Sequence, residues 1–332
     1  MKKILVTGSE GFIGSHLVEL LLSKGFKVRA FVFYNSFNSK GWLDYIKPNR
    51  NLEFFFGDIR DYENINNAII GCDIVIHLAA LISIPYSFHS SNSFVETNIK
   101  GTLNILNSSR KNNIKKIIIT STSEIFGTCK VSPMSENHPI NPQSPYAASK
   151  VGADQLAKSF FYTYKSPVII LRPFNTFGPR QSLRAIIPTV ITQILKNKNN
   201  KIKLGNIDTY RDFNLVTDIV NAFLNAVLSN KKEIYGQEYN IGSGVLIKIK
   251  DIVKIVEKKL NKKVIIISDK KRLRPKSSEV LKLISDSSKF KKTFNWKPKV
   301  LNKKKFILSI NDLVDWYMNN IKSYKDFNDY NF

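Results

Sequence analysis

Tyr146 and Lys150 have the residue types and the spacing that suit proton transfer. Pro145 fits the first position of a predicted helix, and residues four apart on a helix share one face, so the phenol and the ammonium are neighbours. A phenol acts as a base near neutral pH only if its pKa falls well below about 10, and a nearby positive charge lowers it. The pair therefore predicts a base for an alcohol. The spacing alone is a weak pattern, because an exposed helix can carry an ordinary Tyr and Lys.

A hydroxyl-rich segment that ends in a carboxylate precedes this helix. Residues 120–124 read Thr-Ser-Thr-Ser-Glu and follow a β-branched run at 116–119, which is typical of a buried parallel strand. Open α/β sheets bind their ligands beyond the carboxyl ends of such strands. Thr122 can hold the hydroxyl group that the tyrosine deprotonates, and Glu124 can remove a proton from carbon. The alternative for Glu124 is an exposed loop carboxylate.

The N-terminal segment predicts a site for a dinucleotide. Residues 2–7 predict a strand and residues 15–23 a helix, with three glycines between them in the spacing GxxGxxG. Gly8 permits a tight turn, Gly11 lets the main chain approach a pyrophosphate, and Gly14 lets helix and strand pack closely. The helix N-terminus adds donors and a positive dipole end for the phosphates.

The second predicted strand, at 27–33, lacks the residue that usually separates NAD from NADP. An acid at its end would hold the adenosine ribose, yet neither a carboxylate nor an arginine stands in the run that follows. The polar side chains there that can replace it are Asn35, Ser36, Asn38 and Ser39. We expect the cofactor to be NAD, because no arginine follows this strand to bind a 2′-phosphate. NADP stays open as the alternative.

Two further strand ends contribute to the predicted cofactor site. Asp58 follows a strand at 52–56 and can meet the adenine amino group, although it can also be the N-cap of the next helix. The strand at 73–77 leads into Leu-Ala-Ala at 78–80, where small residues let a cofactor lie close. His77 is expected to pack at the strand end and not to act as a catalyst.

The composition limits the classes of protein to consider. The 332 residues include 51 Lys and Arg against 26 Asp and Glu, a net charge of +25. The lysines are spread beside asparagines and form no basic stripe with interleaved aromatic residues, so we expect no nucleic-acid partner. Cys72, Cys129 and the four histidines lack metal-ligand spacing, so no metal is expected. No apolar run reaches the length of a membrane span and no secretory leader is recognised, which predicts a cytoplasmic protein without a membrane partner.

The order of the predicted elements indicates the fold class. Four or more βα units in series predict an α/β protein with a doubly wound parallel Rossmann sheet and a smaller C-terminal substrate-binding lobe. We assign residues 1–175 to the NAD-binding domain, with 206–240 returning to it. We assign 176–205 and 241–320 to the substrate-binding lobe, and 321–332 to a tail.

These motifs together resemble the extended short-chain dehydrogenase/reductases that act on nucleotide sugars, the NAD-dependent epimerase/dehydratase family. The resemblance covers about residues 1 to 320 and rests on the glycine turn, Asp58-Ile59, 77–80, Asn98-Ile99-Lys100-Gly101-Thr102, the 120–124 cluster, Tyr146 with Lys150, 171–180, 210–213 and 296–298. From the motifs and the resemblance, the expected cofactor-binding residues are Gly8, Gly11, Phe12, Ile13, Gly14, Asn35, Asp58, Ile59, Leu78, Ala79, Ala80, Asn98, Ser121, Tyr146, Lys150 and Pro173.

The same resemblance implies a nucleoside-diphosphate sugar as the substrate. Asn175, Arg211 and Arg274 match family positions for its phosphates, and arginines suit such anions. The full expected substrate-binding set is Ser83, Asn175, Arg180, Arg184, Lys203, Arg211, Arg274 and Glu279. In dimers of this family, helices at the positions of 95–112 and 146–163 pair as a four-helix bundle, so we expect a homodimer. The aromatic residues Phe160, Phe161 and Tyr164 fit such an interface, though they can equally face the core.

The Thr-Ser-Glu order resembles the GDP-mannose 4,6-dehydratases, and the chain as a whole is similar to the N-acetylglucosamine 4,6-dehydratases of legionaminic-acid-type pathways. The expected catalytic residues are Thr122, Ser123, Glu124, Tyr146 and Lys150. Dehydratases acting on dTDP-glucose carry Asp at the position of Ser123, so the acid for the C6 hydroxyl stays open among Ser123, a water and Glu124. The alternatives are a 4-epimerase, a UDP-glucuronate decarboxylase and a non-catalytic regulator, and the choice of UDP or GDP and the C2 substituent stay open.

Overall fold

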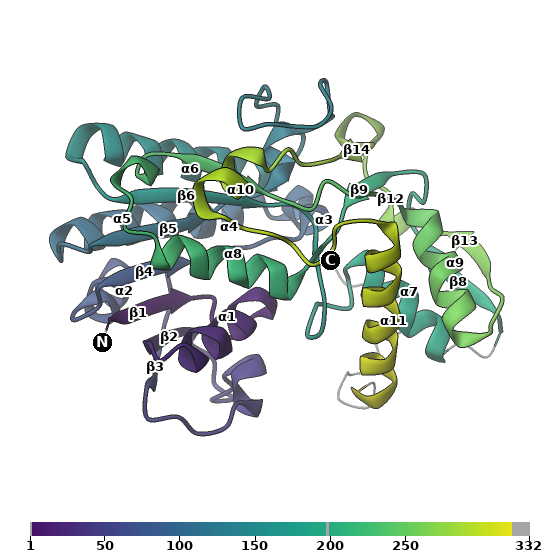
Figure 1. The fold of residues 1–332 in the computed structure, drawn as a ribbon, viewed down its shortest axis with the longest axis horizontal. Helices are drawn as coiled ribbons and strands as arrows, with labels where there is room; N and C mark the ends of the chain where they lie inside the picture. Colours follow the sequence, from purple (N-terminus) through teal and green to yellow (C-terminus); the bar gives the residue numbers. More distant parts are fainter. Residues whose placement is uncertain (1, 197–198, 321–332) are drawn as a thin grey trace.

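The computed structural model describes residues 2–196 and 199–320, and its centre is a parallel sheet of seven strands in the order β11-β6-β5-β4-β1-β2-β3 (Figure 1). The strands are β1 Lys3–Thr7, β2 Lys27–Phe33, β3 Leu52–Gly57, β4 Ile74–His77, β5 Lys116–Thr120, β6 Val168–Pro173 and β11 Glu238–Ile241. The predicted doubly wound α/β fold is confirmed. The strand order reverses between β1 and β4, which is where such sheets open a crevice for ligands.

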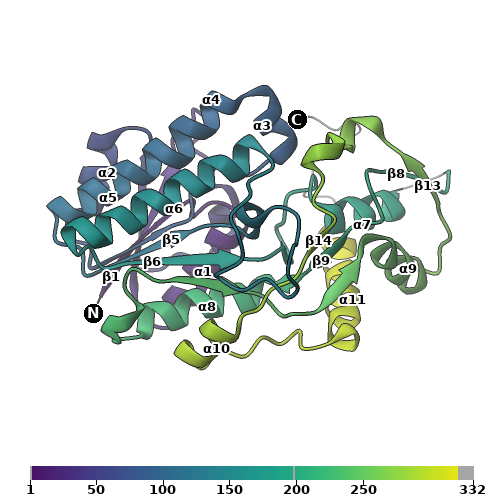
Figure 2. The same ribbon diagram turned by 90° about the horizontal axis from the view of Figure 1, so that it is seen from above.

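Helices cover both faces of this sheet (Figure 2). One face carries α1 Phe12–Ser23, α8 Val216–Leu228 and α10 Ser288–Phe294, and the other carries α2 Tyr62–Ile69, α5 Gly101–Lys111 and α6 Pro145–Tyr164. Alternate residues of a strand point to opposite faces, so Ile4 and Val6 join the first core while Leu5 joins the second. Because both faces are buried, the strands are continuous β-branched runs.

The helical region that includes the expected dimer helix at 95–112 is interrupted. It consists of α4 Ser91–Phe94, a π-helical segment Val95–Lys100 and α5, and α3 Ile84–His89 precedes it. The wider turn places Asn98 on the inner side, fully buried. π-Helical turns occur often at functional sites, and this one stands beside the expected cofactor loop.

The second lobe has its own small sheets and its own core. Its helices are α7 Ile186–Lys196, α9 Ile249–Leu260 and α11 Lys303–Asn320, and its strands are β8 Lys201–Leu204, β9 Tyr210–Asp212, β12 Leu246–Lys248, β13 Ile265–Ser268 and β14 Lys282–Leu283. Two short strands, β7 Thr176–Phe177 and β10 Asn214–Leu215, link the lobes. Ile191, Ile252 and Phe306 are among its fully buried residues.

The chain crosses between the lobes more often than the predicted boundaries allow. Phe290 and Trp296 lie within 241–320, yet they are buried in the core of the first lobe, and the Trp296 indole donates to the carbonyl of Asp218. In the opposite sense, β9 lies within 206–240 but pairs with β12 and β14. The division into two lobes remains a proposal with these two exchanges, and the predicted tail lies outside the described residues. Among the described residues, no helix is both long and apolar enough to cross a membrane.

Candidate functional site

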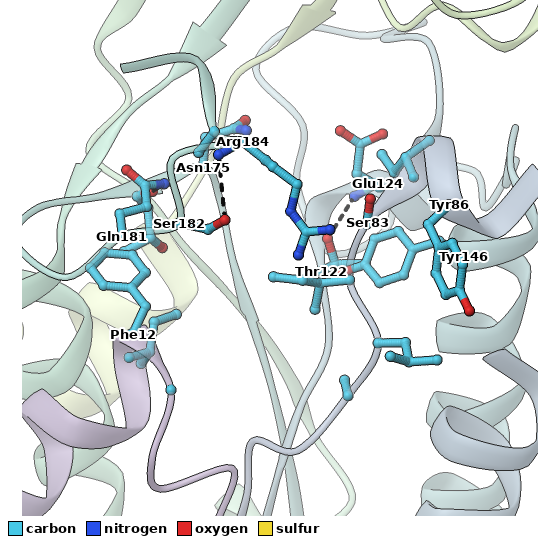
Figure 3. Close-up of a pocket in the computed structure, with 18 of the residues that line it drawn as sticks. Phe12, Ser83, Tyr86, Thr122, Glu124, Tyr146, Asn175, Gln181, Ser182 and Arg184 are labelled. Carbon is cyan, nitrogen blue, oxygen red and sulfur yellow. Dashed lines mark hydrogen bonds between the residues drawn. The ribbon is translucent and has the colours of Figure 1, made fainter. Parts of the chain in front are cut away.

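The carboxyl ends of β1, β4, β5 and β6 open on one cavity of about 930 Å³, which residues of the second lobe also line (Figure 3). Most of the predicted site residues line it. They are Gly8, Gly11, Phe12, Ile13, Gly14, Asp58, Ile59, Leu78, Ala79, Ala80, Ser83, Ser121, Thr122, Ser123, Glu124, Tyr146, Lys150, Pro173, Asn175, Arg184, Arg211, Arg274 and Glu279. Segments far apart in the sequence are thus brought together as expected.

The glycine turn is built without room for side chains. Gly8 has a φ of +65°, and a Cβ there would lie 2.8 Å from the nitrogen of Ala79. A Cβ on Gly14 would collide with the carbonyl oxygen of Gly8. The Thr7 hydroxyl accepts the N–H of Ala79 at 3.2 Å, which fixes the two loops side by side. The N-terminus of α1 therefore faces the cavity with its donors free for a pyrophosphate, and this cradle fits a dinucleotide.

At the end of the cavity expected to hold the adenosine, Asp58 pairs with Arg60, and Asn35 does not line the cavity. The Arg60 guanidinium donates to Asp58 at 2.9 and 3.0 Å, and these hydrogen bonds hold the pKa of the Asp58 carboxyl below its usual range. The N-cap of α2 is Asp61, so Asp58 is free of that alternative role. Asn35 does not line the cavity, because its amide bonds the main chain of Phe33 and Ser39 in its own loop. Its predicted contact with the ribose is wrong in this arrangement.

Asn98 also lies behind the cavity wall and not in it. Its amide nitrogen donates to the carbonyl of Leu81 and to the Ser149 hydroxyl, and its amide oxygen accepts the N–H of Leu81 at 2.9 Å. Ser149 in turn donates to the carbonyl of Tyr146 at 2.7 Å. Asn98 therefore joins the loop after β4 to the helix that carries the expected base, which corrects its predicted role as a cofactor ligand.

The predicted base and its hydroxyl partner meet in the cavity. Tyr146 lies within hydrogen-bonding reach of the Thr122 hydroxyl. Burial raises the pKa of Tyr146 to about 12, and the charges of Glu124 and Asp154 add to that rise, while the bond with Thr122 lowers it. The predicted fall of the phenol pKa is therefore wrong for this set of protein groups. The phenol is buried among Phe94 and Ile84, and this burial is the largest cause of the rise.

Lys150 is buried and forms a short hydrogen bond with the main chain. Its Nζ donates to the carbonyl oxygen of Thr120 at 2.5 Å. Burial lowers the pKa of Lys150 to about 8, and the carboxylate of Asp154 raises it in part. His77, expected to be a packed strand-end residue, is buried with its Nδ1 against the Thr7 hydroxyl at 2.8 Å, and burial lowers its pKa to about 3.

Glu124 is placed as a second proton-transfer group. It lies in the 3₁₀ turn Ser123–Phe126, where the Thr122 hydroxyl oxygen accepts its main-chain N–H at 3.2 Å. Its carboxylate lies 3.5 Å from the guanidinium of Arg274, a residue of the second lobe. The alternative of an exposed loop carboxylate fails, since the Glu124 side chain is 11% exposed and lines the cavity. The phenol of Tyr146, the hydroxyl of Thr122 and the carboxylate of Glu124 therefore all face the same cavity.

The far end of the cavity is cationic. Arg211 is buried, lies 4.0 Å from the carboxylate of Glu279, and has its pKa lowered by burial. Asn175 lines the same end with its amide oxygen buried and without a partner. In Figure 3 the Arg184 side chain extends across the cavity toward Glu124. These groups can receive a charged, oxygen-rich ligand.

Two of the predicted substrate residues lie outside the cavity lining. Arg180 has a φ of +69°, and its guanidinium pairs with Glu19 at 2.8 and 2.9 Å and with the Ser15 hydroxyl at 3.2 Å. Lys203 is exposed on β8, where its main chain bonds the side chain of Gln193. Both expectations are corrected. The second lobe lines the cavity through the predicted Arg184, Arg274 and Glu279 and through residues that were not predicted, including Arg272.

Several lining residues were missed from the sequence. They are Glu10, Arg60, Tyr86, Gln181 and Arg272. Tyr86 and Gln181 stand next to predicted positions and give no distinct signal. Glu10 did give a signal, because it is a carboxylate inside a glycine turn that otherwise serves phosphates. Within the described residues, no group of three His, Cys, Asp or Glu side chains can hold a metal ion.

Comparison with known sequences gives one consistent family. A family model described as GDP-mannose 4,6 dehydratase matches residues 5–305. The dTDP-D-glucose 4,6-dehydratase of Dictyostelium discoideum is 36% identical over 273 residues. Those residues are 76% of this chain but only 61% of that relative, less than two thirds of its length.

Solved structures are similar over almost the whole chain. The dTDP-glucose 4,6-dehydratase DesIV of Streptomyces venezuelae, crystallised with NAD, superposes with a TM-score of 0.86 at 27% identity and covers 97% of this chain and 99% of its own. The UDP-glucuronic acid 4-epimerase of Bacillus cereus, crystallised with UDP-glucuronic acid and NAD, gives 0.85 at 27% identity with coverage of 97% and 99%. The fold and the cofactor are common to both neighbours, whereas the net reaction differs.

Proposed function

Because the chain belongs to the GDP-mannose 4,6 dehydratase family and uses NAD, we propose that it is a nucleotide-sugar 4,6-dehydratase acting on a UDP- or GDP-N-acetylglucosamine-like hexose. One observation carries the proposal. Glu124 places a shielded carboxylate beside the hydrogen-bonded Tyr146 and Thr122. A 4-epimerase needs a base for the C4 hydroxyl only, whereas a dehydratase needs a second base for the C5 proton.

Tyr146 serves as the base for the C4 hydroxyl. Thr122 bonds the phenol and can bond the same sugar hydroxyl, so the proton has a short path. NAD held by the glycine turn would supply the hydride acceptor and donor, and its oxidised ring would add a positive charge to the cavity. That charge, together with the ammonium of Lys150, opposes the effect of burial on the phenol pKa. Lys150 stays fixed to the Thr120 carbonyl, so its charge is always presented at the same place.

Glu124 removes the C5 proton once C4 is a ketone, because the ketone makes that proton acidic. Loss of the C6 hydroxyl as water then gives an unsaturated ketone, and its reduction at C6 with a proton returned to C5 gives the 4-keto-6-deoxy sugar. Ser123 is buried next to Glu124 and lines the cavity, so Ser123, a water or Glu124 itself can supply the proton to the leaving hydroxyl. The carboxylate acts best if its partner Arg274 is drawn to another anion.

We expect the substrate diphosphate to be the anion that draws Arg274 away from Glu124. Arg211, Arg274 and Arg184 lie at the end of the cavity that faces the second lobe. The Arg274 contact with Glu124 is long and single, so a diphosphate can replace it at small cost. Substrate binding and release of the base are thereby linked.

The test uses the protein with NAD and each of UDP-N-acetylglucosamine, GDP-N-acetylglucosamine and dTDP-glucose in deuterated water. We expect mass spectrometry to show loss of water and gain of one deuterium at C5 for a UDP or GDP sugar. Glu124→Gln should abolish both, with a fall in rate of about 10²- to 10⁴-fold, because a positioned base contributes about that much. NAD binding should stay intact.

Glu279→Gln is the matched control, since Glu279 lines the same cavity but lies beside Arg211. It should alter KM and leave the deuterium gain per turnover unchanged. A product of unchanged mass with inverted C4 would reject the dehydratase in favour of the epimerase, the reaction named for one of the structural neighbours. Turnover of dTDP-glucose alone would keep the reaction and reject the proposed sugar.

We also propose a cytoplasmic homodimer that forms through α5 and α6. Tyr162 and Tyr164 are 64% and 50% exposed on α6, as large apolar side chains at an interface would be. Phe160 does not contribute, because it is buried in the core with α5. Sedimentation should show a dimer, and Tyr162→Glu should shift it toward the monomer. A wild-type monomer would reject the dimer.

A further inference from the structure

Glu10 of the glycine turn places a carboxylate at the end of β2, which has no carboxylate of its own there. Its Oε1 accepts the main-chain N–H of Phe33, the last residue of β2, at 3.0 Å. Its Oε2 is buried and has no partner. Glu10 and Phe33 both line the cavity at the end where Asp58 and Ile59 stand. A dinucleotide on the α1 N-terminus places its adenosine ribose at the end of β2.

The loop after β2 holds Glu10 in this position. The carbonyl of Glu10 accepts the N–H of Trp42 at 3.1 Å. Gly41 packs so tightly that a Cβ there would lie 2.7 Å from the same carbonyl oxygen. Asn35, the polar side chain nearest to the strand end, is occupied with its own loop. Glu10 is thus a fixed acceptor with one open oxygen.

We propose that Glu10 accepts a hydrogen bond from the 2′-hydroxyl of the adenosine ribose of NAD and thereby excludes NADP. A buried acceptor without a partner is costly, and a ribose hydroxyl supplies the missing donor. A 2′-phosphate would set a second negative charge against the carboxylate, which is strongly unfavourable in a partly buried site. The inference concerns cofactor binding, so it holds whichever reaction the sugar undergoes.

The charges around this end of the cavity support the same selection. Arg60 is a cation that could receive a 2′-phosphate, but it donates to both oxygens of Asp58. Lys40 lies over the ring of Phe54, 4.8 Å from its centroid. A phosphate would therefore have to break an existing pair to find a positive partner, and it would still face Glu10.

The test measures binding of NAD and of NADP by calorimetry to protein stripped of nucleotide. We expect the wild type to bind NAD at least about 100-fold more tightly than NADP, because apposed like charges are strongly unfavourable. Glu10→Gln should weaken NAD binding about tenfold, since a charged acceptor becomes a neutral amide, and NADP binding should be unchanged or tighter. The ratio of the two dissociation constants should therefore fall about tenfold or more in this variant.

Glu10→Gln separates the ribose contact from a purely structural role. Its amide oxygen can still accept the N–H of Phe33, so the thermal unfolding midpoint should stay near that of the wild type. Glu63→Gln, an exposed change in the first turn of α2 away from the cavity, is the matched control and should leave both constants unchanged. A Glu10→Gln protein of wild-type stability with a wild-type ratio would overturn the proposal, as would a wild type that binds both nucleotides equally.

Discussion

Two pairs of arginine and carboxylate differ in burial, because one lies in the core of the first lobe and the other lines the cavity. Asp154 and Arg172 are each 1% exposed, with Oδ2 and a guanidinium nitrogen 3.2 Å apart. Glu124 and Arg274 are 11% and 21% exposed, with one contact of 3.5 Å. The first pair joins α6 to β6, within one lobe. The second joins the two lobes across the cavity.

The difference shows how one fold separates a permanent ion pair from an exchangeable one. Asp154 also accepts the Ser121 hydroxyl at 2.7 Å, and removing Arg172 would leave its buried carboxylate without its ion-pair partner. Glu124 keeps contact with the cavity, so a ligand can take its place at Arg274. Burial decides this, because desolvation makes a lone charge costly only where water cannot return.

Breaking the closed pair should have the largest effect. Asp154→Asn removes the charge that Arg172 needs, and we expect a loss of about 3–5 kcal/mol in the free energy of unfolding, measured by urea denaturation. The double variant Asp154→Asn with Arg172→Met should regain part of that loss, because neither charge of this pair is then left without its partner. A loss below about 1 kcal/mol in the single variant would mean that water reaches this pair.

Breaking the open pair should instead affect binding. Arg274→Met should weaken binding of UDP and GDP by about 10- to 100-fold, as expected for a lost charge-assisted hydrogen bond, and should change stability by less than about 1 kcal/mol. Calorimetry and thermal unfolding measure the two effects. Arg180→Met is the control, because Arg180 is tied to Glu19 outside the cavity and should leave nucleotide affinity unchanged. Equal effects of both changes on affinity would contradict the assignment of the two arginines.

Lys150, one helical turn before Asp154, should show its effect in the pH dependence of stability. Its pKa is lowered from 10.5 to about 8 by burial, so between these values the unfolded chain binds more protons than the folded one. The free energy of unfolding should therefore rise with pH in this window, by up to about 1.4 kcal/mol per pH unit from this group. Lys150→Met should lack that rise over about pH 8 to 10. Parallel pH profiles for the two proteins would show that the lysine titrates normally.

How far the sequence predicts this site depends on how local the determinant is. The glycine turn is determined by close backbone contacts within a few residues. Tyr146 and Lys150 are placed together by a single helix. Both features could therefore be predicted from the sequence. Arg180 was misplaced because its direction is set by Glu19, a residue of α1 more than a hundred positions away. The same holds for Trp296, which returns to the first lobe to meet Asp218.

The direction of the Tyr146 pKa and the role of Glu10 were beyond the sequence for related reasons. A motif names the charged partner of the phenol but not the Phe94 and Ile84 side chains that remove its water. Likewise, the missing acid of β2 was sought next to the strand, while the carboxylate arrives from the glycine turn through the N–H of Phe33. In both cases the outcome depends on which side chains the fold brings together, and the sequence pattern does not give this.

The buried amide of Asn98 has a mechanical consequence for the whole site. Through Leu81 on one side and Ser149 on the other, it makes the loop that flanks the dinucleotide and the helical turn that carries the phenol a single rigid body. A shift of either part is transmitted to the other over two hydrogen bonds. Cofactor binding and the alignment of the base therefore depend on the same hydrogen bonds, so a substitution that disturbs one should also disturb the other.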